Sequence, residues 1–130
     1  MKRILLIFER RRWLPTLMWA ITIFIVSSIP RIGITIARLE GCDKIAHFVE
    51  YFVLGWALRY WSRDGRARFL AGGIAYAAFD EFHQRYVPGR VMNLGDFVAD
   101  AAGITLGFLM IGAIYRRRAK ASHKESSEDG

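Results

Sequence analysis

The chain has 130 residues, enough for one domain, and 53% of them are hydrophobic, a share that favours a membrane protein over a soluble one. Its formal charge of +7 would suit nucleic acid, but the basic residues stand in short clusters between apolar segments, so we exclude nucleic acid as a partner. The single cysteine, Cys42, excludes an intrachain disulfide and a cysteine cluster for zinc.

The first apolar segment follows a basic stretch at residues 1–12. It is uncharged over residues 13–30 and is about long enough to cross a bilayer as a helix. Small residues near Val26 and Ser28 would also suit cleavage of a signal peptide, but the run is longer than the apolar part of such peptides. We therefore predict a retained span that ends at Pro30 and Gly33.

Three more apolar segments follow, at residues 45–61, 69–86 and 94–115. Turn signals separate them, Asp64-Gly65 after the second span and Pro88-Gly89 after the third. Residues 116–130 are basic and then polar, which predicts a disordered tail. The predicted fold is all-α, a polytopic membrane protein with four transmembrane helices.

The basic residues predict the orientation of these spans. Five lie at the N-terminus, four between Arg59 and Arg68, and five between Arg116 and Lys124, so that 14 of the 19 would share one face. By the positive-inside rule both termini are cytoplasmic. Seven of the twelve acidic residues then lie at or below the outer face.

These acidic residues fall on helix faces that can meet. On the second span Asp43, His47, Glu50 and Tyr51 form one stripe, because they are spaced at i, i+4, i+7 and i+8. The third span carries Asp80, Glu81 and Gln84, and the fourth carries Asp96 and Asp100 in line with Gly103 and Gly107. The two glycines are typical of close helix packing. Ionisable groups within a membrane segment are functional candidates by default.

This set of side chains predicts a polar site that faces the outer leaflet. We assign candidate catalytic roles to His47, Glu50, Asp80 and Glu81. We assign substrate binding to Arg90, Gln84, Asp96, Asp100, Tyr51 and Lys44. A divalent metal is the cofactor that such a set could hold, although no compact ligand motif is present. The alternative is a structural network in which Arg90 and Lys44 neutralise part of the carboxylates.

The same residues resemble the VanZ-like family over about residues 43–108. The resemblance rests on Asp43, Lys44, His47, Tyr51, Leu54 and Gly55, then Asp80, Glu81 and Gln84, then Val87-Pro88-Gly89-Arg90, and finally Asp96, Asp100, Gly103 and Gly107. The family consists of small bacterial integral membrane proteins, and its namesake is associated with low-level resistance to the glycopeptide teicoplanin. The resemblance implies a multi-pass protein of the bacterial cytoplasmic membrane, and it implies no settled reaction.

Three functions remain open at this point. The first is an envelope protein that binds or modifies an anionic headgroup of a membrane lipid or a lipid-linked envelope precursor, with Arg90 holding the anion. The second is a non-catalytic membrane factor that affects glycopeptide access or envelope assembly. The third is a proton-coupled carrier, which would need oligomers because four spans are few for a transporter.

Overall fold

The computed structural model describes residues 11–31, 40–62 and 64–128, and within these residues it contains four α-helices and no strand. The helices are α2 (Trp13–Ser27), α3 (Glu40–Trp61), α4 (Ala67–Gln84) and α5 (Leu94–Glu128). The prediction of an all-α fold is confirmed. Residues 1–10 and the connection with Gly33 and Arg38 lie outside the described residues.

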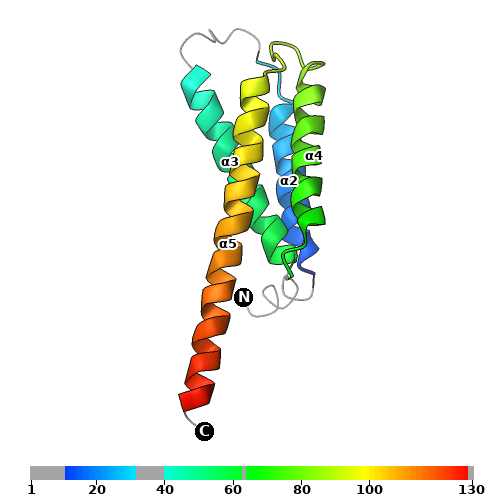
Figure 1. Ribbon diagram of the computed structural model, residues 1–130. Helices are drawn as coiled ribbons and strands as arrows, with labels where there is room; N and C mark the ends of the chain where they lie inside the picture. The colour runs from blue at the N-terminus through cyan, green and yellow to red at the C-terminus, as the bar shows by residue number, and fades with distance from the viewer. Residues whose placement is uncertain (1–10, 32–39, 63, 129–130) are drawn as a thin grey trace.

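Consecutive helices run in opposite directions (Figure 1). As a result, α2 begins and α5 ends at one end of the bundle, while α2 and α4 end at the other, where α3 and α5 begin. We call this second end the polar end, because the predicted acidic residues of α3, α4 and α5 lie toward it.

Local sequence explains how the helices end there. Pro30 follows α2 closely and cannot continue a helix. After α4, Pro88 is followed by Gly89 with φ of 77°, a conformation that glycine adopts without strain. The carboxamide oxygen of Asn93 accepts a hydrogen bond from the Gly95 amide at 2.8 Å and so caps the start of α5.

The last helix is longer than the sequence predicts. We expected the fourth span to end near Tyr115 and the tail to be disordered, but α5 continues to Glu128 and has 35 residues. The extension contains neither proline nor glycine and is rich in Ala, Arg, Lys and Glu, which favour helix. Because the preceding turns are already formed, each added residue propagates an existing helix and needs no new nucleus.

Glycines set the closest helix contact, where α3 crosses α5. A Cβ atom on Gly103 would lie 2.4 Å from the Phe48 carbonyl oxygen, and one on Gly107 would lie 2.2 Å from that of Phe52. Neither distance is possible for real atoms, so the two backbones can approach this closely only with glycine. The predicted packing role of the two glycines is confirmed.

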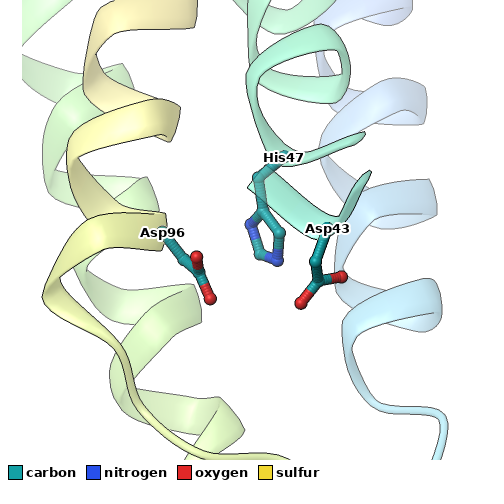
Figure 2. Close-up of side chains that lie close together, drawn as sticks. All are labelled: Asp43, His47 and Asp96. Atoms are coloured by element: carbon teal, nitrogen blue, oxygen red, sulfur yellow. The ribbon is translucent and has the colours of Figure 1, made fainter. Parts of the chain in front are cut away.

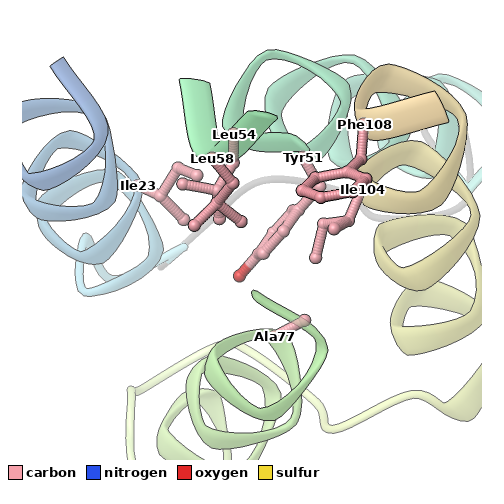
Figure 3. Packing of buried hydrophobic residues seen from close by; sticks show 7 residues of the cluster. All are labelled: Ile23, Tyr51, Leu54, Leu58, Ala77, Ile104 and Phe108. Atoms are coloured by element: carbon pink, nitrogen blue, oxygen red, sulfur yellow. The ribbon is translucent and has the colours of Figure 1, made fainter. Parts of the chain in front are cut away.

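The interior combines a small apolar core with many polar groups. The apolar cluster in Figure 3 consists of Ile23, Tyr51, Leu54, Leu58, Ala77, Ile104 and Phe108. Ten polar or charged residues of the described part are also buried, while large apolar side chains such as Ile25, Val49 and Leu109 are more than half exposed. Polar groups inside and apolar groups outside are the arrangement expected of helices that face lipid.

By length and composition, one helix is a candidate membrane span. Of the helices in the described part, only α5 is both long and apolar enough: within Leu94–Lys124, an 18-residue stretch has a mean hydropathy of 1.9. The apolar helix α2 is shorter, with 15 residues. The ionisable residues in α3 and α4 lower the hydropathy of those helices. That the protein has four transmembrane spans therefore stays a prediction.

Candidate functional site

The predicted site residues gather at the polar end of the bundle, where they come from α3, α4, α5 and the loop after α4. Seven of the ten are buried: His47, Tyr51, Asp80, Glu81, Gln84, Asp96 and Asp100. Helix spacing therefore predicted the inward-facing set correctly. The other three predicted residues, Lys44, Glu50 and Arg90, are more exposed than this buried set.

Asp80 is the centre of a complete hydrogen-bond network. Its two carboxylate oxygens accept hydrogen bonds from Ser27 Oγ at 2.6 Å, from Tyr51 Oη at 3.0 Å and from Gln84 Nε2 at 3.2 Å. These donors come from α2, α3 and α4, so one carboxylate joins three helices. Buried carboxylates of this kind stabilise a particular packing because all their acceptor positions are satisfied.

His47 pairs with a carboxylate of another helix. Its Nδ1 lies 3.0 Å from Asp100 Oδ1, and both side chains are buried. The carboxylate that contacts His47 is therefore that of Asp100 on α5, while Glu50 of α3 lines the neighbouring cavity. A carboxylate at one ring nitrogen fixes the orientation of an imidazole and leaves the other nitrogen for a ligand or a proton.

Figure 2 shows the His47 ring between Asp96 and Asp43. Asp96 Oδ1 lies 3.3 Å from Lys44 Nζ, an ion pair that lacks hydrogen-bond geometry. Asp43, in contrast, holds both of its oxygens against Arg31, at 2.7 and 2.8 Å. The hydrogen bond from Arg31 is the main reason why the pKa of Asp43 is lowered from its ordinary value.

Arg90 has contacts that the sequence did not predict. Its guanidinium donates to the backbone carbonyl oxygen of Val26 at 2.8 Å. Two longer hydrogen bonds, both of 3.4 Å, reach the backbone carbonyl oxygen of Ile29 and the side-chain Oε1 of Gln84. Val26 lies in the last turn of α2 and Ile29 just after the helix, where backbone carbonyls have no i+4 partner within the helix. Burial lowers the pKa of Arg90, and the nearby Arg31 lowers it further. Arg90 therefore joins the loop to α2.

A small cavity opens among these groups. Water-sized molecules can occupy about 30 Å³ of it, which is room for one or two waters. Its polar lining includes Ser27, Arg31, His47, Glu50, Asp80 and Arg90. A phosphate or a sugar would not fit inside without movement of the side chains, so a larger ligand would bind at the mouth.

Two site residues escaped the sequence-based prediction. Ser27 stands with Ser28 near the end of an apolar run, where a serine gives no signal, yet its Oγ donates to Asp80, 53 positions later in the chain. Arg31 looked like a topology determinant, but it pairs with Asp43 and lines the cavity. Its position directly after the first predicted span was the signal available, since that is where the polar end of the bundle begins.

The fold and the site together define a class: an all-α protein in which three helices bury a cluster of carboxylates around one histidine. The model of the VanZ/LLP1 family matches residues 5–115, and the chain belongs to this family. The match covers the N-terminal helix as well as the motif residues, so it extends beyond the resemblance seen in the sequence. No curated protein and no solved structure matches the chain.

Proposed function

We propose that the chain is a multi-pass protein of the bacterial cytoplasmic membrane, with four spans and cytoplasmic termini, that binds an anionic lipid headgroup at its polar end. The observation that carries this proposal is the presence of two guanidinium groups, those of Arg31 and Arg90, in the lining of the cavity. Arginine pairs well with phosphate because its planar guanidinium donates two parallel hydrogen bonds.

The membrane part of the proposal is supported by the distribution of side chains. Apolar residues cover the outside of the helices while charged ones are buried. The two ends also differ: Arg12, Trp13, Trp61, Arg66, Arg68 and Phe69 surround an open hollow at the end opposite the cavity. A mixture of basic and aromatic side chains is typical of the cytoplasmic membrane interface.

The headgroup part follows from the charges at the mouth. Arg31 and Arg90 both line the cavity, so two like charges stand at its mouth and repel each other. An anion bound between them would reduce that repulsion. The cavity beneath would place His47 and Glu50 next to the headgroup, and the Glu50 carboxylate is suited to accept a proton from a bound hydroxyl or water. On this basis the site binds the headgroup and has the groups needed to modify it.

The second candidate is a non-catalytic membrane factor that affects antibiotic access or envelope assembly. It is favoured by the number of site residues whose polar groups already have hydrogen-bond partners within the chain. Asp80 has three donors, and Arg90 has carbonyl partners at the end of α2. Such residues would stabilise the fold and would take no part in binding or catalysis.

Lipid binding to the purified protein separates the two candidates. We expect native mass spectrometry in detergent to show bound phosphatidylglycerol or polyprenyl phosphate, and little phosphatidylcholine. Arg31→Gln should weaken this binding about tenfold, which corresponds to one lost charge-assisted hydrogen bond. Arg85→Gln is the matched control, because Arg85 is an exposed basic residue at the same end. Equal binding of anionic and zwitterionic lipids, or an equal loss in both variants, would contradict headgroup binding.

A further inference from the structure

Three side chains of types that bind metals, one from each of three helices, lie close together in the interior. The residues are His47 of α3, Glu81 of α4 and Asp100 of α5. One possible ligand atom of each lies within 4.8 Å of the other two. Their exposed fractions are 5%, 2% and 0%, so bulk water does not reach them freely.

Two carboxylate oxygens at this point have no hydrogen-bond partner among the described residues. Glu81 uses Oε1 to accept a hydrogen bond from the Asn93 amide, while Oε2 has none. Asp100 uses Oδ1 for His47, while Oδ2 has none. A buried carboxylate oxygen without a partner is costly, so these two oxygens require a proton or a cation between them.

The balance of charge near the point also favours a cation. Glu81, Asp96 and Asp100 are three buried acids. Among the described residues, the basic side chains within 4 Å of any of them are Lys44, which pairs with Asp96, and His47, which contacts Asp100. Lys44 contacts only Asp96 and is itself nearly half exposed. A divalent ion would neutralise the two remaining carboxylates at once.

The donor set indicates the kind of ion. One imidazole with two carboxylates suits a divalent transition metal such as Zn²⁺ or Mn²⁺, whereas Mg²⁺ and Ca²⁺ prefer oxygen donors alone. Ligand atoms at about 2.0–2.2 Å from such an ion lie about 3–4 Å from one another. The three side chains, whose ligand atoms lie within 4.8 Å of one another, would need to close in by less than about 2 Å to bind it. Asp96, one helical turn before Asp100, is not part of this set, because its Oδ1 lies 3.3 Å from Lys44 Nζ.

A second grouping, Asp43 with His47 and Asp96, is less suitable (Figure 2). Both oxygens of Asp43 already contact Arg31, and Asp43 is partly exposed. Metal binding there would break an existing ion pair. We propose that His47, Glu81 and Asp100 form a binding site for one divalent transition-metal ion. This cation site does not depend on lipid binding at the mouth.

Metal content tests this site without any lipid. After treatment with a chelator, the full-length protein in detergent is incubated with Zn²⁺ or Mn²⁺, freed of excess ion, and measured by elemental mass spectrometry. We expect about one ion per chain in the wild type, together with a melting temperature that rises with metal concentration. In Glu81→Gln and Asp100→Asn, metal affinity should fall at least tenfold.

Two controls make the result specific. Asp80→Asn changes the neighbouring buried acid of α4, whose oxygens are all hydrogen-bonded, and should keep the wild-type metal content. Asp43→Asn removes a ligand of the second grouping only, and should also keep it. The proposal is overturned if the wild type retains no metal, if Glu81→Gln retains as much as the wild type, or if Asp43→Asn alone loses it.

A spectroscopic measurement covers the case in which Glu81→Gln does not fold. X-ray absorption on the metal-loaded wild type should show one imidazole nitrogen among oxygen ligands. A spectrum without imidazole would exclude His47 and overturn the assignment. A protein that binds metal but no anionic lipid would contradict the proposed headgroup function and leave the cation site intact.

Discussion

Asp80→Ala should destabilise the protein by about 3 kcal/mol. The alanine removes the acceptor of three hydrogen bonds that join α2, α3 and α4. Ser27 Oγ retains a second acceptor, the Phe24 carbonyl at 3.0 Å, but the Tyr51 hydroxyl loses its acceptor in a buried position. Burying a polar group without a partner costs about 1–3 kcal/mol, and Gln84 loses a contact as well.

The matched variant is Asp80→Asn. Asparagine keeps the size of the side chain and one acceptor oxygen, and its amide group can donate to Tyr51. We expect it to lose less than half as much stability as Asp80→Ala. The free energy of unfolding, measured by titrating a denaturing detergent into mixed micelles, gives both values. Equal stability of wild type and Asp80→Ala would mean that the network does not join the helices.

The second large effect is expected at the crossing of α3 and α5. Gly107→Ala would place a Cβ atom 2.2 Å from the Phe52 carbonyl oxygen and 3.1 Å from the Trp56 amide nitrogen. Both are backbone atoms, so the helices must separate, and overpacking of this kind costs about 1–3 kcal/mol or more. The same unfolding titration measures this loss.

Gly72→Ala is the control for this substitution. Gly72 is also inside a helix, but a Cβ atom there would meet nothing within 4 Å. Alanine favours helix over glycine by about 0.5–1 kcal/mol, so this variant should be as stable as the wild type or slightly more stable. Destabilisation of both variants to the same extent would show that close packing at Gly107 is not the cause.

The sequence predicted the inward-facing residues well because helix periodicity determines which side chains share a face. Asp96 and Asp100 are one turn apart on α5, and both are buried. The glycines at 103 and 107 continue that face, and they pack against α3 as expected. Helix existence and the turn at Pro88-Gly89 follow from equally local signals.

Partners between helices were predicted less well, because local periodicity does not fix how helices rotate and cross. His47 contacts Asp100 and not Glu50, since α5 lies against α3 at the position of His47. Arg90 reaches the carbonyl groups at the end of α2, 61 and 64 positions earlier in the chain. The length of α5 was underestimated because polar composition was taken to mean disorder, although the residues themselves favour helix.

The most direct test of the central claim is which side of the membrane each end of the bundle faces. In a Cys42→Ser background, a single cysteine is introduced by Val91→Cys in the exposed loop before α5 or by Ser122→Cys in the last turns of α5. A membrane-impermeant maleimide added to intact spheroplasts should label Val91→Cys at once and Ser122→Cys only after the membrane is permeabilised. Labelling of Ser122→Cys in intact cells, or protection of Val91→Cys, would contradict a polar site that faces the outer leaflet.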